Sequence, residues 1–126
     1  MTGDSRRRAR IGTASAPDIA VTAIGRDRVA ALRGEIDLAA VAKMSPIVND
    51  LMRSAPPRLV LELTGVSFID SRGLAMIVGL LRRIEAADGR LVVVCPPGAA
   101  REAIELAGVG RLLTFAGSVD AALGDG

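Results

Sequence analysis

Residues 58–85 read RLVLELTGVSFIDSRGLAMIVGLLRRIE, and within them a pattern typical of a strand gives way to one typical of a helix. Leu59–Leu63 is a short apolar run of strand length that follows the helix-breaking pair Pro56–Pro57. Thr64-Gly65 indicates a turn, and after Asp70 the apolar residues recur at helical spacing. The predicted buried face of that helix comprises Leu74, Ile77, Val78, Leu81 and Ile84.

The junction between strand and helix, Asp70-Ser71, is the first candidate functional site. Either residue can cap the helix, because its side-chain oxygen can accept a hydrogen bond from a backbone N–H of the first turn. Gly73 lies in that turn and has no Cβ, so another molecule can approach the backbone closely. A helix N-terminus favours negative charge, phosphate included. A serine hydroxyl held at this position is therefore suited to phosphorylation.

The segment LTGVSFIDSRGLAMI, residues 63–77, resembles the signature of the STAS domain family, named after sulphate transporters and anti-sigma factor antagonists. It is most similar to the stand-alone bacterial anti-sigma factor antagonists, whose motif reads approximately D-S-S/T-G-L after an apolar strand. In those proteins the serine after the aspartate is phosphorylated by a kinase that is itself the anti-sigma factor. The resemblance implies that Ser71 is the phosphorylated residue, with Asp70 and Gly73 as matching neighbours. Arg72 departs from the pattern, which usually has a second small hydroxyl residue there.

A second match is GEID, residues 34–37, which resembles the family's G-E-L/I-D element. In the family this aspartate lies close to the phosphorylatable serine, so the resemblance makes Asp37 a candidate residue of the partner-binding site. Asp37 also precedes a predicted helix at 38–53 and is well placed to cap it. Both roles are open from the sequence alone. Pro46 interrupts that helical pattern and predicts a kink or a late helix start.

Four residues that follow Ser71 lie off the predicted buried face, namely Arg72, Met76, Leu80 and Arg83. Methionine and leucine beside arginine are typical of a surface that binds another protein. The two apolar side chains would equally fit under a neighbouring helix. The candidate partner-binding residues are therefore Asp37, Asp70, Ser71, Arg72, Gly73, Met76, Leu80 and Arg83.

The rest of the chain predicts strands that alternate with helices. Strand patterns occupy 19–24, 29–36, 59–63, 91–95 and 112–115, and helical patterns occupy 38–53, 74–86, 99–107 and 118–123, with Gly89 ending the central helix. The first two strands form a hairpin, and the alternation that follows implies right-handed crossovers between parallel strands. The predicted fold is one α/β, STAS-like domain with a mixed, mainly parallel sheet of about five strands and about four helices.

The charge distribution divides the 126-residue chain into a tail and a domain. The chain has 16 basic and 14 acidic residues, and four of the arginines lie within residues 1–10. Residues 1–17 show no apolar periodicity, so we expect a disordered, Arg-rich tail followed by a STAS-like domain at 18–126. The domain is nearly neutral, which argues against direct nucleic-acid binding by the folded part.

Several kinds of chemistry are excluded by composition. The chain has no histidine, so Ser-His-Asp catalysis and histidine-based metal sites are ruled out. The only lysine, Lys43, is followed by Met44 and cannot belong to a P-loop. Cys95 lies in a buried-strand pattern and is expected to be a core thiol. We expect no enzyme, no metal and no cofactor. The longest apolar run, 74–81, is too short for membrane insertion, which needs about 20 residues.

The resemblance implies a small cytoplasmic interaction module, a monomer or weak dimer, that binds an anti-sigma factor of the serine-kinase type. It would release a sigma factor and be switched off by phosphorylation of Ser71. The single cysteine, which excludes an internal disulfide, agrees with a cytoplasmic location. Two alternatives stay open: a STAS-like module of a transporter accessory or stress-signalling complex, and a small-nucleotide or lipid-binding domain.

Overall fold

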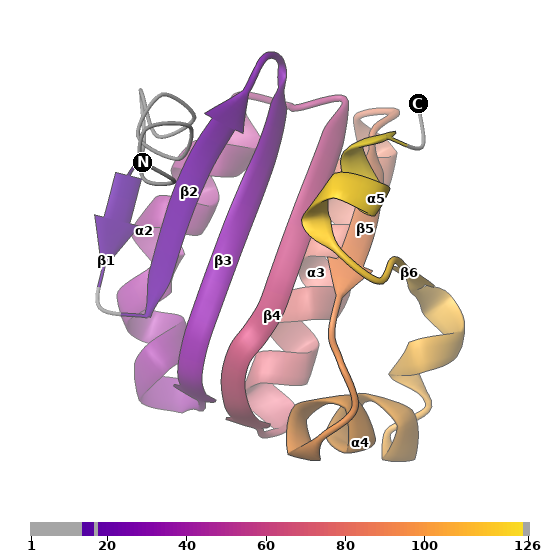
Figure 1. The fold of residues 1–126 in the computed structure, drawn as a ribbon. Coiled ribbons are helices and arrows are strands. Elements are labelled where there is room, and N and C mark those ends of the chain that lie inside the picture. Colours follow the sequence, from indigo (N-terminus) through magenta and orange to yellow (C-terminus); the bar gives the residue numbers. More distant parts are fainter. Residues whose placement is uncertain (1–13, 17, 125–126) are drawn as a thin grey trace, which may run out of the picture.

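In the computed structural model, which describes residues 14–16 and 18–124, six strands lie side by side in chain order (Figure 1). The first three strands are antiparallel neighbours, and each later strand is parallel to the one before it. The strands are β1 (Ala14–Ala16), β2 (Ile19–Ile24), β3 (Asp27–Ile36), β4 (Arg58–Ile69), β5 (Arg90–Val94) and β6 (Thr114–Phe115). The predicted α/β fold with a mixed, mainly parallel sheet is confirmed.

Helices cover the two faces of the sheet unequally. The helices of the described part are α2 (Leu38–Arg53), α3 (Ser71–Ala86), α4 (Ala99–Leu106) and α5 (Val119–Gly124), with a 3-10 turn at Val109–Leu112. Because each crossover between parallel neighbours is right-handed, α2 and α3 lie together behind the sheet in Figure 1, and α4 packs against the same apolar core. Of the described helices, α5 alone lies in front, over a smaller cluster of Val29, Val60, Val92, Val94 and Ala122.

The register between β3 and β4 brings the two aspartate motifs to one edge of the sheet. Arg28 pairs with Leu59 near the start of the strands, and Ile36 pairs with Ile69 at their ends. Two register shifts in between absorb the extra length of β4, one of them beside Gly65. Thr64-Gly65 is therefore not a turn, and β4 runs without a break from the first apolar run to Ile69. The residues after β3 and β4, Asp37 and Asp70, emerge as neighbours.

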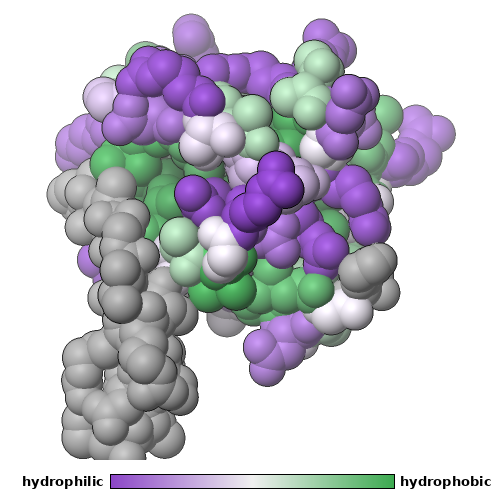
Figure 2. All heavy atoms as spheres, turned by 90° about the horizontal axis from the view of Figure 1, so that it is seen from above, coloured by the Kyte–Doolittle hydropathy of each residue, from purple (hydrophilic) through white to green (hydrophobic). Residues whose placement is uncertain are grey.

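The opposite end of the molecule carries the β2–β3 turn and the C-terminal helix α5. Figure 2 looks onto this end, where hydrophilic residues cover much of the surface and apolar residues form smaller areas between them. The two capping aspartates lie at the other end of the parallel strands, where α2 and α3 begin. The candidate functional residues Asp37 and Asp70 therefore lie together at the carboxyl edge of β3 and β4.

The folded part begins earlier than the sequence predicts. Ala14–Ala16, which we assigned to a disordered tail, form β1 and pair with β2, with Ala16 opposite Ile19. An edge strand pairs through backbone groups, so it needs no apolar periodicity to be recruited. The other residues of the predicted tail, 1–13 and 17, lie outside the described residues.

Two predicted helix boundaries differ from the structure. Pro46 causes no late start, because α2 runs from Leu38 through Pro46 to Arg53. Pro46 and Ala42 both lie on the exposed side of α2, where water can satisfy the carbonyl group that proline leaves without an N–H. At the end of α3 the left-handed residue is Asp88, with φ of +62°, and not Gly89. Glycine is required at position 89 because there is no room for a side chain: a Cβ there would lie 2.8 Å from the carbonyl oxygen of Pro56.

The terminal helix α5 is held to the sheet by Arg58. The Nη1 atom of Arg58 donates to the carbonyl oxygens of Ala122 at 2.9 Å and Leu123 at 2.5 Å. These carbonyls belong to the last turn of a short helix, where a cation is favourable and intrahelical partners run out. Arg58 thus joins the start of β4 to the C-terminal end of α5.

Replacing Arg58 by methionine is expected to loosen α5 without unfolding the domain. Methionine keeps an unbranched apolar stem but removes two charge-assisted hydrogen bonds, which together stabilise α5 by about 2 kcal/mol. Backbone hydrogen exchange in residues 119–123 should accelerate, while exchange in β3 and β4 stays unchanged. Arg90→Met is the matched control, because Arg90 pairs with Arg58 in the sheet but is exposed. Equal exchange rates in the two variants would contradict the role of Arg58.

Candidate functional site

Two helices begin side by side at the carboxyl edge of the sheet, and each is capped by an aspartate. The Oδ1 atom of Asp37 accepts from the backbone N–H of Ala40 at 2.9 Å. The Oδ1 atom of Asp70 accepts from the N–H groups of Arg72 at 2.9 Å and Gly73 at 3.1 Å. The capping roles of Asp37 and Asp70 are confirmed, and Asp70 rather than Ser71 is the N-cap of α3.

The two capped ends are linked directly through the backbone. The N–H of Asp70 donates to the carbonyl oxygen of Ile36 at 3.2 Å, so the start of α3 is joined to the end of β3. Asp37, the next residue after Ile36, caps α2. The GEID motif and the segment DSRGL, residues 70–74, lie more than thirty residues apart in the chain. In the structure they are adjacent and joined by this hydrogen bond.

Ser71 is the first residue of α3 and is exposed. Since Asp70 accepts from the N–H groups of the first turn, the Ser71 hydroxyl has no capping role. Within residues 18–124 it makes no hydrogen bond to another described group. The site therefore presents a hydroxyl nucleophile at a helix N-terminus, where an added phosphate is electrostatically tolerated.

Gly73 acts by positioning the start of α3. A Cβ at this buried position would lie 2.6 Å from the carbonyl oxygen of Ile36 and 2.7 Å from Cγ2 of Ile69. The groups that approach Gly73 closely thus belong to strands β3 and β4 of the same chain, and not to another molecule. Gly73 is not exposed to a partner, and its contribution to the site is to let Ser71 and Arg72 sit directly over the sheet edge.

The face of α3 that meets the sheet is rotated relative to the prediction. Ile77, Leu81 and Ile84 are buried as expected, but Leu74 and Val78 are only half-buried. Leu80 is 3% exposed because it packs toward α2, so the alternative of burial under a neighbouring helix is the correct one for Leu80. Met76 is half-buried, and Arg72 and Arg83 are exposed.

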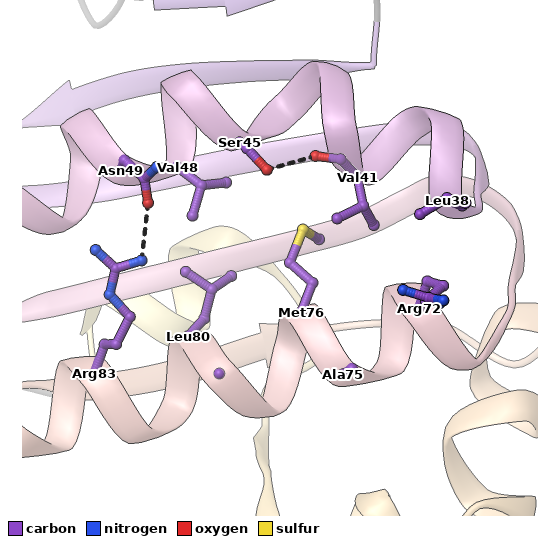
Figure 3. Close-up of a pocket in the computed structure, with 11 residues that line it drawn as sticks. Leu38, Val41, Ser45, Val48, Asn49, Arg72, Ala75, Met76, Leu80 and Arg83 are labelled. Carbon is purple, nitrogen blue, oxygen red and sulfur yellow. Dashed lines mark hydrogen bonds between the residues drawn. The ribbon is translucent and has the colours of Figure 1, made fainter.

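A groove of about 350 Å³ runs between α2 and α3, and it collects four predicted partner-binding residues (Figure 3). Met76 and Leu80 point toward α2, and Arg83 donates from Nη1 to Oδ1 of Asn49 at 3.1 Å. The groove is lined by Leu38, Val41, Ser45, Val48, Asn49, Arg72, Ala75, Met76, Gly79, Leu80 and Arg83. The contribution of α2 was not predicted, because helical periodicity does not show which two helices become neighbours.

Two large apolar side chains near the site were also missed. Leu38, the first residue of α2, is 56% exposed, and Figure 3 shows it at the same end of the groove as Arg72. Phe68 is 47% exposed and pairs with Glu35 at the end of the sheet. The exposure of Leu38 could have been predicted, because the first residue of a helix that begins at a sheet edge extends beyond the core.

Other reactive or ligand-binding groups are scarce in the described part. Burial raises the pKa of the Cys95 thiol, an effect that the nearby Arg101 guanidinium partly opposes. Cys95 is 4% exposed, as predicted for a core thiol. Within residues 14–16 and 18–124 there is no group of three or more histidine, cysteine, aspartate or glutamate residues arranged to hold a metal ion. None of the helices described there is long and apolar enough to cross a membrane.

The fold and site define a class of α/β domain in which an exposed serine follows an aspartate cap at the sheet edge. The STAS domain model matches residues 18–122, and the chain belongs to the STAS domain family. An anti-sigma F factor antagonist of Lysinibacillus sphaericus is 30% identical over 80 residues, which are 63% of this chain and 68% of that protein.

Solved structures agree with this assignment. The crystal structure of an anti-sigma factor antagonist from Mycobacterium paratuberculosis is 27% identical, with a TM-score of 0.77 over 88% of this chain and 97% of that one. The Bacillus cell fate determinant SpoIIAA, in its phosphorylated form, is 23% identical, with a TM-score of 0.65 over 84% of this chain and 96% of that one. The latter likeness concerns the fold.

Proposed function

We propose that this protein is an anti-sigma factor antagonist that binds an anti-sigma factor of the serine-kinase type, releases a sigma factor, and is switched off by phosphorylation of Ser71. The observation that carries the proposal is the exposed Ser71 hydroxyl, which follows the Asp70 cap at the first turn of α3. The names of the Lysinibacillus and Mycobacterium relatives support it. The protein would act in the cytoplasm as a regulatory module without catalytic activity of its own.

The geometry of Ser71 suits it to be a kinase substrate. The hydroxyl is accessible and makes no hydrogen bond with the described groups, so no interaction within the domain must break before transfer. In the transfer, the bond between the γ-phosphorus of ATP and the oxygen that bridges it to the β-phosphate breaks, and ADP leaves. A bond from the γ-phosphorus to Ser71 Oγ forms. The hydroxyl proton passes to a base of the kinase. ATP and the base both come from the partner, which agrees with a chain that has no histidine.

The residues around Ser71 form the surface that the partner would contact. Arg72, Met76 and Arg83 extend from Ser71 along α3, and Leu38 and Phe68 add exposed apolar area at the same edge. Asp37 would contribute indirectly, by fixing the start of α2 beside the start of α3. Apolar side chains surrounded by arginine are typical of protein interfaces.

The proposal is tested by incubating the full chain with ATP and each kinase-type anti-sigma factor encoded in the source genome. One of these kinases is expected to add a single phosphate to the wild-type protein and none to Ser71→Ala. Ser67→Ala is the matched control and should be phosphorylated as fully as wild type, because Ser67 is an exposed serine of β4 only four residues away. Full phosphorylation of Ser71→Ala would place the modified residue elsewhere.

A further inference from the structure

The groove between α2 and α3 has an apolar centre and positively charged ends. Val41 and Val48 of α2 face Met76 and Leu80 of α3 across it (Figure 3). Arg72 and Arg83 are its only charged lining residues among the described part of the chain, and no acidic residue lines it. They lie 11 positions apart on one helix, which separates them by about 16 Å along its axis.

Gly79, in the middle of α3, keeps the groove open at a cost to the domain. A Cβ at Gly79 would meet no atom within 4 Å, and its backbone does not have positive φ. Neither packing nor backbone conformation within the described chain therefore requires glycine. In the interior of a helix, glycine is less favourable than alanine because it loses more backbone freedom on folding. The open space above Gly79, beside the small Ala75, is what a closely approaching backbone needs.

We propose that this groove binds one amphipathic α-helix of the partner protein. Apolar side chains of that helix would lie against Met76 and the valines of α2. Two acidic residues, about eleven positions apart, would pair with Arg72 and Arg83. Helices commonly bind in apolar grooves in this way. The identity of the partner as an anti-sigma factor rests on the proposed function, whereas the chemistry of the bound helix rests on the groove.

The groove also supplies a reason why a modification of Ser71 would affect binding along α3. Arg72 follows Ser71 directly and marks the nearer end of the groove. A phosphate on Ser71 would compete for the guanidinium of Arg72 and repel the acidic residue of the partner helix at that end. The opposite end, at Arg83, would be unaffected.

The first experiment measures the affinity of the anti-sigma factor that phosphorylates Ser71 for variants of the full chain, without ATP. Arg83→Glu reverses the charge at the far end of the groove, and Gly79→Leu fills its centre. Each is expected to weaken binding about tenfold or more, with no fall in the melting temperature of Gly79→Leu. The matched controls, Arg82→Glu and Ala86→Leu, alter exposed residues of α3 that do not line the groove and should bind within about twofold of wild type.

Unchanged affinity of both groove variants for a kinase that phosphorylates Ser71 would overturn the inference and leave the proposed function intact. Equal losses in Arg82→Glu and Arg83→Glu would also overturn it, because the effect would then come from net charge alone. A change in sedimentation of the purified Gly79→Leu protein would assign the groove to a second copy of this chain, and so reject a partner helix.

A second experiment needs no natural partner, so it separates the groove from the proposed function. The probe is a fluorescein-labelled synthetic helical peptide with two glutamates eleven positions apart and leucines between them on the same face. Its anisotropy should rise with wild-type protein and much less with Arg83→Glu. A control peptide with lysines in place of the glutamates should not bind. Equal binding of both peptides would overturn the inference, even if a kinase of Ser71 is known.

Discussion

Alanine in place of Gly73 is expected to lower the free energy of unfolding by about 3 kcal/mol. The added Cβ would lie 2.6 Å from the carbonyl oxygen of Ile36, far inside van der Waals contact. That oxygen is held by the N–H of Asp70 and belongs to a fully buried residue. It cannot turn aside like the end of a flexible side chain, so α3 would have to move away from the sheet.

Denaturant unfolding of Gly73→Ala beside Gly79→Ala measures this effect directly. Both variants place the same methyl group in the same helix, but the Cβ at Gly79 meets nothing within 4 Å. Gly79→Ala should therefore gain about 1 kcal/mol from helix propensity alone. If Gly73→Ala lowers the free energy of unfolding and Gly79→Ala raises it, the effect at Gly73 comes from the close contact at Ile36 and not from removing a glycine in general. A neutral Gly73→Ala would mean that the start of α3 has room to shift.

The parts of the fold that the sequence predicts correctly are those specified by local signals. The capping roles of Asp37 and Asp70 follow from an aspartate placed just before an apolar helical pattern. The β-branched run of β5 and the turn before β3 predict their strands for the same reason. These signals need no knowledge of which elements lie side by side.

The parts that the sequence does not predict depend on contacts between distant segments. Helical spacing places Leu74 on the predicted buried face and Leu80 off it, and only the location of α2 determines that Leu80 is the more buried of the two. Likewise, the two register shifts between β3 and β4 cannot be found in either strand alone. The groove depends on the packing of α2 beside α3, which explains why four of its residues on α3 could be selected but none on α2.

A negative charge at Ser71 is expected to weaken binding to the cognate anti-sigma factor by about 100-fold while leaving the domain folded. Inside the domain the charge lies at the first turn of α3, where the helix dipole favours it by a few tenths of a kcal/mol. At an interface the same charge must lose water and would repel the acidic residue of the partner that pairs with Arg72, which costs several kcal/mol. Since about 1.4 kcal/mol corresponds to tenfold in affinity, part of that cost is enough to release the partner.

The variants Ser71→Asp and Ser71→Asn test this account, because they have nearly the same shape and differ in charge. Ser71→Asp should keep the wild-type circular-dichroism spectrum and melting temperature, and lose most of its affinity in a titration with the anti-sigma factor. Ser71→Asn should lose far less. Equal losses would show that size at Ser71 matters rather than charge. If Ser71→Asp binds like wild type, Ser71 lies outside the interface, and its exposed position after the Asp70 cap has no part in switching.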